Sequence, residues 1–485
     1  MMKSQRALHI IISFLPIILL IGFLTYAIKV FGTDVSSGAS QICLLAASAA
    51  CVGVGMCLYR HKWEEFEKAL YQKVGGVSTA IFILLSIGAI SGSWMISGVV
   101  PTLMYYGIQV IHPQFFLVST TIICAIVSVM TGSSWTTVAT IGVALMGIGH
   151  AQGFSDGWIA GAIISGAYFG DKMSPLSDTT VIASSSTGTP LFIHIKYMLF
   201  TTVPSLCCAL AIFAIAGFSH QVNDFTSIDV YLDALSGKFN ITLWLLIVPL
   251  ITGILIARKQ PSLITLFTSA FVAILFALLF QPHLLAEISG DGSLCKGCFM
   301  TLYGPTHLDI GTPDLNRLIA TKGMSGMMNT IWMLLCAMCF GATMETGGML
   351  EGITTCFARV TGRRVPMVIS TVCSGIFFVL ATADQYLAII LTGNIFKKEY
   401  RHRGYESRLL SRTIEDSATV TSPLVPWAAC GMAQSAVLGV PTLVYLPYSF
   451  FNLISPVMTI IVAATGYKIF RKESRDISPS PQDVR

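Results

Sequence analysis

Residues 170–180 have the sequence GDKMSPLSDTT, which places Asp171, Lys172 and Asp178 inside a long apolar part of the chain. A charged side chain at membrane depth costs roughly 2.5–3.5 kcal/mol even on lenient insertion scales, so such residues need a reason. Pro175 interrupts the run, and a proline removes one helix hydrogen bond and frees backbone carbonyls. Carboxylates, hydroxyls and free carbonyls are hard oxygen ligands, which suit alkali and alkaline-earth cations. The run therefore predicts a broken membrane helix beside a cation site.

The composition of the whole chain supports this interpretation. Of its 485 residues, 54% are hydrophobic and 11% are charged, whereas a soluble domain carries about 25% charged residues. The mean hydropathy is +0.74. These values exclude a soluble globular enzyme, and also a disordered or nucleic-acid-binding chain, which needs many more charges. The chain is predicted to be a polytopic membrane protein whose main partner is the lipid bilayer, with no nucleic acid bound.

Ten apolar runs are long enough to cross a bilayer, which takes about 20 residues. They lie at 8–28, 40–58, 77–104, 158–187, 198–217, 240–257, 262–281, 327–350, 413–439 and 443–467. Two more apolar stretches, 114–149 and 365–396, contain polar residues near their middles and are predicted to be re-entrant hairpins. The predicted fold class is therefore all-α, with spans, hairpins and broken helices.

The positive charges suggest an orientation. With the N-terminus in the cytoplasm and each span changing sides, 23 of the 29 Lys and Arg residues fall inside and five outside. Cytoplasmic loops carry this excess in membrane proteins. The bias survives only if both hairpins return to the side they left. We expect a multi-pass protein of the cell (inner or plasma) membrane with both termini in the cytoplasm.

The chain also partly matches itself at a shift of 249 residues. Gly92, Met95 and Gly98 fall on Gly341, Met344 and Gly347, and the polar break 132–137 falls on 381–386. Each half holds five spans and one hairpin, so the halves must be inverted in the membrane. Inverted repeats with broken helices are typical of secondary transporters, which bind their cargo near the midplane.

The predicted boundaries follow from this repeat. They are a first repeat at 1–218, with hairpin 114–149 and broken helix 158–187; an external linker at 219–237; a second repeat at 238–470, with external loop 282–324, hairpin 365–396 and broken helix 413–439; and a cytoplasmic tail at 471–485.

Six acidic residues are placed at membrane depth: Asp171, Asp178, Glu345, Asp384, Glu415 and Asp416. Glu345 has no proline nearby and is equally well explained as a structural partner near a helix end. The residues predicted to bind ion or substrate are Asp171, Ser174, Asp178, Thr179, Ser133, Ser134, Thr382, Asp384, Gln385, Asp416, Ser417 and Thr419, with Na⁺ expected at Asp178, Asp384 and Asp416. Lys172 is either a counter-ion for a nearby aspartate or a substrate contact.

Two segments outside the spans carry recognisable patterns. Cys295 and Cys298 form a single CxxC, which fits a redox pair better than half of a zinc site because no second CxxC accompanies it. Between Arg60 and Lys73, Trp63, Phe66 and Leu70 recur at helical spacing among charges, which predicts an amphipathic helix at the cytoplasmic interface.

Three motifs resemble the signatures of the NhaC family of sodium:proton antiporters. They are residues 170–180, residues 383–386 (ADQY) and residues 415–427 (EDSATVTSPLVPW), and the likeness runs from about residue 75 to 465. The resemblance implies the ion-transporter superfamily fold, with a scaffold domain and a moving transport domain in each protomer, usually as a homodimer. That family includes antiporters, relatives that exchange malate for lactate, and carriers of amino acids.

Two transport functions follow from these observations. The first is secondary active export of Na⁺ in exchange for H⁺, because a desolvated carboxylate has a raised pKa and trades its proton near neutral pH. The alternative is a Na⁺- and H⁺-coupled carrier of a small organic acid or amino acid, with Lys172 neutralising a carboxylate and Trp135 or Tyr386 lining its pocket. We expect no cofactor besides the transported ions and no enzyme activity, because the apolar segments contain no HExxH motif, Ser/His dyad or Cys/His cluster.

Overall fold

The computed structural model describes residues 2–31, 38–219, 225–258, 260–311, 316, 319–350, 352–353 and 363–470. The predicted cytoplasmic tail, 471–485, lies outside the described residues. Within them the chain is helical, and the one β-type contact is an isolated bridge between Thr306 and Thr321. The all-α fold class is confirmed.

The helices of the first half follow one another with short connections. They are α1 Met2–Phe31, α2 Ala39–Leu58, α3 Trp63–Gly76, α4 Ser78–Ile96, α5 Val99–Val110, α6 Phe116–Thr131, α7 Ser134–Thr137, α8 Val143–Ala151, α9 Asp156–Met173, α10 Asp178–Thr187, α11 Leu191–Ser219 and α12 Phe225–Lys238. The α12 helix occupies most of the predicted linker 219–237, so that linker is largely helical.

The second half is also built from helices. Its helices are α13 Ile247–Ala257, α14 Ser262–Phe280, α15 Pro282–Ser289, α16 Leu294–Tyr303, α18 Met328–Thr346, α20 Arg364–Thr382, α21 Gln385–His402, α22 Ser407–Ile414, α23 Ala429–Leu438, α24 Thr442–Tyr445 and α25 Phe450–Thr465. The predicted loop 282–324 contains α15 and α16, which pack against each other.

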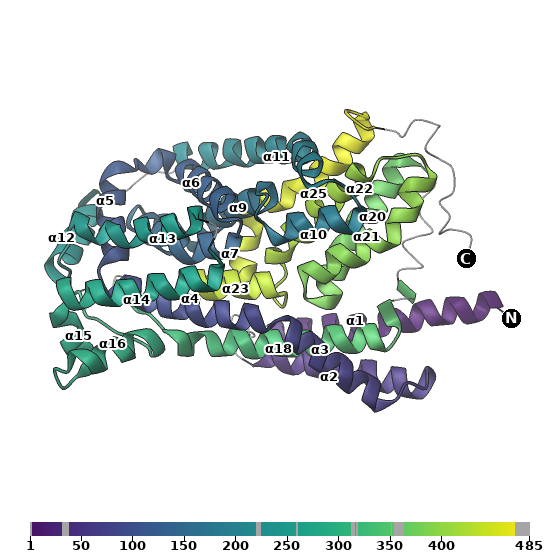
Figure 1. The fold of residues 1–485 in the computed structure, drawn as a ribbon, viewed down its shortest axis with the longest axis horizontal. Coiled ribbons are helices and arrows are strands. Elements are labelled where there is room, and N and C mark those ends of the chain that lie inside the picture. Colours follow the sequence, from purple (N-terminus) through teal and green to yellow (C-terminus); the bar gives the residue numbers. More distant parts are fainter. Residues whose placement is uncertain are drawn as a thin grey trace.

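The described residues contain eight helices that are long and apolar enough to cross a membrane, or up to ten if each of two sharply bent helix pairs counts as one span. The first turns of α1 and the last turns of α25 lie at the same end of the molecule (Figure 1). An even number of crossings requires that arrangement. The predicted ten equals the upper limit of this count, but the members differ: the count includes Pro113–Thr131 and Arg364–Thr382, which lie in the predicted hairpins, and does not include the predicted spans 158–187 and 443–467.

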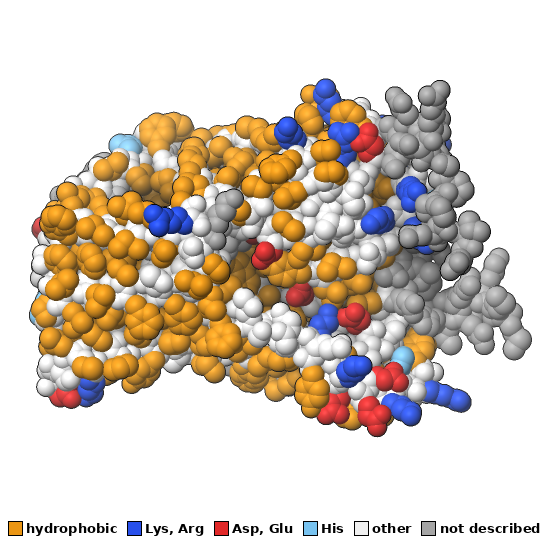
Figure 2. Space-filling view, in the orientation of Figure 1, with side chains coloured by type: hydrophobic (Ala, Val, Ile, Leu, Met, Phe, Trp, Pro, Cys, Tyr) orange, Lys and Arg blue, Asp and Glu red, His pale blue; other side chains and the backbone are white. Residues whose placement is uncertain are grey.

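The surface is consistent with a membrane protein. Apolar side chains cover the long flank of the molecule, while Lys and Arg gather mainly near the end that carries α20, α21 and α22 (Figures 1 and 2). At that end α3 packs against α18, with Phe66 buried and Trp63 and Tyr71 exposed. The predicted amphipathic helix is therefore present.

The two predicted broken helices, 158–187 and 413–439, are broken, and so is 77–104, which is predicted above as a single span. Residues 77–104 form α4 and α5, separated at Gly98, whose φ of 83° lies in the left-handed region that favours glycine. Residues 158–187 form α9 and α10, separated by a turn at 174–177 in which the N–H of Ser177 donates to the Ser174 carbonyl (3.2 Å). Residues 413–439 contain the end of α22, a π-helical turn at Glu415–Thr419, and α23.

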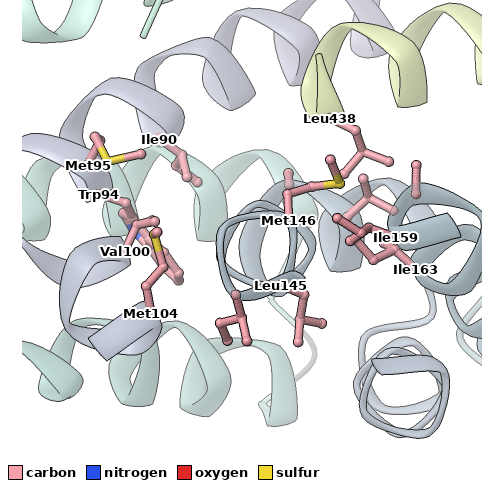
Figure 3. Close-up of a cluster of buried hydrophobic side chains, with 14 of the residues drawn as sticks. Ile90, Trp94, Met95, Val100, Met104, Leu145, Met146, Ile159, Ile163 and Leu438 are labelled. Atoms are coloured by element: carbon pink, nitrogen blue, oxygen red, sulfur yellow. The ribbon is translucent and has the colours of Figure 1, made fainter. Parts of the chain in front are cut away.

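Close helix packing positions the interior polar residues. Apolar side chains of α4, α5, α8 and α9 interlock in one buried cluster, including Trp94, Met104, Leu145 and Ile163 (Figure 3). The α6 helix lies along α9, where a Cβ on Gly166 or Gly170 would collide with α6. Small residues let membrane helices approach closely. This contact sets the end of α9, with Asp171, beside the break that follows α6.

Candidate ion-binding site

Two helix breaks, one in each half, have the same local structure. After α6, Gly132 adopts a φ of 68°, and after α20, Ala383 adopts a φ of 57°. The preceding threonines act alike: the Thr131 hydroxyl donates to the Ser133 carbonyl (3.2 Å), and the Thr382 hydroxyl donates to the Asp384 carbonyl (3.1 Å). In the structure Gly132 corresponds to Ala383, whereas the sequence match pairs residue 132 with residue 381. The structural correspondence is therefore shifted by two residues. This local likeness supports a repeat, and its inversion in the membrane stays a prediction.

Each break also starts a new helix with a side-chain cap. The Ser133 hydroxyl accepts from the backbone N–H of Thr136 (3.2 Å), and Asp384 Oδ1 accepts from the N–H of Leu387 (2.9 Å). Free N–H groups at a helix start need such acceptors. Ser133 and Asp384 are therefore held at the tips of the two breaks.

Each break docks on the connection between two helical segments of its own half. Gly132 lies against Leu176, so closely that an added Cβ would come within 2.7 Å of the Leu176 Cβ. In the second half, the backbone N–H of Ala429 donates to the Ala383 carbonyl (2.9 Å), and Trp427 Nε1 donates to the Leu380 carbonyl (2.9 Å). The helix breaks therefore meet the unwound segments, as expected for a binding site built from broken helices.

Asp171 is fixed at the centre of the first contact. It is 5% exposed at the end of α9, and its two carboxylate oxygens accept hydrogen bonds from Ser134 (2.8 Å) and from Ser177. The Ser177 hydroxyl also contacts that of Thr179 (3.0 Å). Two donated hydrogen bonds stabilise a buried carboxylate and fix its orientation.

A cavity of about 710 Å³ opens beside these residues. Acidic side chains border a hollow near the middle of an otherwise apolar face (Figure 2). Asp178 is exposed at the start of α10, Asp384 is half-buried, and both line the cavity with Asp171. The phenol of Tyr386 lies near all three carboxylates. The cavity is also lined by Ser133, Thr179, Gln385 and Trp135, so the structure brings together six of the predicted residues and the two predicted aromatics.

Asp416 is not part of this cavity. It is fully buried on the π-helical turn, where Oδ1 accepts from Lys172 Nζ and from the Ser455 hydroxyl (3.1 Å). Lys172 is also fully buried and does not line the cavity. This geometry fits the role of counter-ion, although for Asp416 and not for the nearby Asp171 or Asp178.

The remaining predicted residues have local structural contacts. The Ser174 hydroxyl accepts from the N–H of Leu176, and the Ser417 hydroxyl donates to the Thr413 carbonyl. Thr419 is buried on the same π-helical turn, and its hydroxyl has no hydrogen bond of normal geometry to a described residue. Glu345 is exposed and pairs with Lys73 of α3 (3.0 Å), which favours its structural interpretation.

Sequence reasoning left Glu415 out of the site, although it is the most unusual carboxylate in the interior. It is fully buried, and neither oxygen makes a hydrogen bond of normal geometry to a described residue. Its neighbours are Thr179, Thr419 and Lys172. The adjacent motif residue Asp416 was the available signal, but a π-helical turn that directs two consecutive acidic side chains inward is not visible in a sequence.

A multi-pass membrane protein whose broken helices enclose acidic residues in a central cavity has the architecture of a secondary transporter. Comparison with known proteins agrees. A model described as the Na⁺/H⁺ antiporter family matches residues 166–467. The chain belongs to the Na⁺/H⁺ antiporter family, and it is therefore a transporter rather than an enzyme.

Three relatives show how the family varies. The Na⁺/H⁺ antiporter NhaC of Alkalihalophilus pseudofirmus is 35% identical over 89% of this chain and 91% of its own length. The malate-2H⁺/Na⁺-lactate antiporter of Bacillus subtilis is 32% identical, with 86% and 87% covered. The arginine/ornithine antiporter ArcD of Halobacterium salinarum is 31% identical, with 97% and 94% covered.

Proposed function

We propose that this protein exports Na⁺ in exchange for H⁺, and that the ions bind at Asp171, Asp178 and Asp384. The observation that supports this most is the cavity itself, where three aspartates from both halves of the chain meet. Oxygen ligands of this kind suit Na⁺ and Li⁺ rather than soft metals. Because each carboxylate binds either a cation or a proton, the two ions compete for the same groups.

The aspartates differ in their surroundings, which suggests different roles. Asp171 is held by hydrogen bonds from Ser134 and Ser177, so its carboxylate has a fixed orientation in the site. Asp178 and Asp384 face the cavity with fewer contacts and are the groups that Na⁺ reaches first. Ser133 and Thr179 supply neutral oxygens beside them.

The family and the apolar helices support a multi-pass membrane protein that handles Na⁺ and H⁺. We further propose that it lies in the cell membrane with both termini in the cytoplasm, that it forms a homodimer, and that it needs no cofactor. The proposed orientation rests on the excess of Lys and Arg in the loops assigned to the cytoplasm.

The size of the cavity supports a second candidate, Na⁺- and H⁺-coupled carriage of a small organic solute. A Na⁺ ion with its oxygen ligands fills a small part of about 710 Å³, whereas pockets for small molecules measure about 300–1,000 Å³. The relatives named for malate and lactate, and for arginine and ornithine, make this candidate a serious one.

Everted vesicles that contain the protein and a fluorescent pH probe test the first candidate. Na⁺ added alone should collapse an imposed pH gradient, and vesicles without the protein should keep it. If Na⁺ has no effect until an organic solute is added, the second candidate replaces the first.

A further inference from the structure

The charge of the cavity indicates which kind of organic solute it accepts. Asp171, Asp178 and Asp384 line it, and the described lining residues include no Lys, Arg or His. Lys172, the one basic residue at membrane depth in the sequence, is buried against Asp416 and Ser455 instead. An organic anion entering this cavity would meet three carboxylates and no basic lining residue, which disfavours its binding. Lys73, whose charge acts on Asp384, is paired with Glu345 (3.0 Å) and does not line the cavity.

Three buried polar groups in the cavity wall have no hydrogen-bond partner among the described residues, and one of them is a donor, the indole N–H of Trp135. Gln385 is 5% exposed and its Oε1 has no hydrogen-bond partner among the described residues. Thr265 on α14 is 1% exposed and its hydroxyl is likewise unpartnered within the described part of the chain. Both line the cavity. A buried acceptor without a donor costs about 1–3 kcal/mol, so a cargo with N–H groups would recover that free energy.

The aromatic residues of the cavity add to this preference. Trp135 and Tyr386 line it from the two helix breaks, and Tyr386 lies near all three carboxylates. Aromatic faces attract organic ammonium and guanidinium groups by cation–π interaction, which strengthens as the contact loses water. Na⁺ needs neither the aromatic rings nor the full volume.

We propose that the cavity also binds and transports a small organic cation, an amine or a guanidinium compound, and excludes organic acids. This inference rests on the proposed function, because the same carboxylates that trade Na⁺ for H⁺ bind the cation. Gln385 and Thr265 accept its N–H groups, and Trp135 and Tyr386 contact its carbon skeleton.

Proteoliposomes that contain the full chain test the proposal by uptake of labelled solutes. The cationic probes are arginine and putrescine, and the anionic probes are malate and lactate; Na⁺-driven pH change is recorded in the same preparation. At least one cationic probe should accumulate tenfold or more above protein-free liposomes when Na⁺ is loaded inside, and both anionic probes should stay at background.

Variants separate the organic cation from Na⁺. Gln385→Leu and Thr265→Val should reduce uptake of the cationic probe by tenfold or more while Na⁺/H⁺ exchange falls less than threefold. The matched control is Thr252→Val, a buried threonine of α13 that is bonded to Ser269 and lies outside the cavity, and it should change neither activity.

The outcomes distinguish the two proposals. Uptake of malate or lactate without uptake of a cationic probe overturns the inference, and so does exchange of Na⁺ with no organic uptake at all. Cation uptake without any response to Na⁺ overturns the proposed Na⁺/H⁺ exchange and leaves the inference standing. Equal loss of both activities in Gln385→Leu and Thr265→Val means that these residues serve the site as a whole, which contradicts their assigned role.

Discussion

At the scale of single residues, the two cavity aspartates with the fewest contacts are the sharpest test of the ion site. Asp178→Asn and Asp384→Asn should each reduce Na⁺/H⁺ exchange to background, because an amide keeps the size and one oxygen but loses the charge that trades Na⁺ for H⁺. The measurement is the initial rate of Na⁺-driven pH change in vesicles, with the amount of inserted protein determined by immunoblot.

The matched control is Asp233→Asn, an exposed aspartate of α12 that does not line the cavity, which should keep the full rate. Wild-type exchange with unchanged pH dependence in both cavity mutants would show that Na⁺ needs neither of these two carboxylates. Asp171 would then be the remaining cavity carboxylate to test, because it is already held by two hydroxyl groups.

The helix breaks make a second prediction at this scale. Gly132→Ala should lower thermal stability and exchange together, because left-handed backbone costs a side chain about 1–2 kcal/mol and the new Cβ would collide with Leu176. Ala383 already carries that strain at a φ of 57°, so Ala383→Gly should leave the melting temperature unchanged or slightly higher. Melting of the detergent-purified protein measures both, and an equal loss in the two variants would contradict the shared geometry of the breaks.

At the scale of elements, the unwound segments were accessible from the sequence because proline and acidic residues are costly inside apolar membrane helices and so mark a break or a polar site. The pairing of segments was not accessible. Asp171 and Lys172 are adjacent, so on a helix their side chains point in directions that differ by about 100°. Their spacing does not show which of these directions leads to the cavity and which leads to Asp416. The same limit hid Glu415, which needs the π-helical turn to be buried beside Asp416.

The contact between α9, the π-helical turn and α25 can be tested as a unit. Lys172→Met should destabilise the protein by about 3–5 kcal/mol, because it leaves the buried Asp416 carboxylate without its cation. The double variant Lys172→Met with Asp416→Leu should recover most of the melting temperature, since two apolar side chains can replace a buried ion pair. No recovery in the double variant would show that the pair does more than satisfy its own charges.

At the scale of the whole molecule, composition and hydropathy were sufficient to predict the class and the approximate number of spans. Composition and hydropathy could not determine how far the halves are related. Even the matched breaks at Gly132 and Ala383 show a local likeness and not the orientation of the halves in the bilayer. Nor could composition and hydropathy predict the helices α12, α15 and α16, since polar loop composition is compatible with short helices that pack on neighbours.

The last prediction concerns the side to which the cavity opens. Its lining includes Gly76, Val77 and Thr79 at the junction of α3 and α4, and Gln260 and Ser262 at the start of α14. The excess of Lys and Arg predicts that both segments lie on the cytoplasmic side, so we expect the structure to represent a state open to the inside. Thr79→Cys, in a background whose exposed cysteines are serine, should react with an impermeant maleimide from the cytoplasmic face only. Lys398→Cys and His307→Cys serve as the cytoplasmic and external references. Labelling of Thr79→Cys and His307→Cys from the same face would contradict the topology, whereas protection of Thr79→Cys by Na⁺ would show that ion binding closes this entrance.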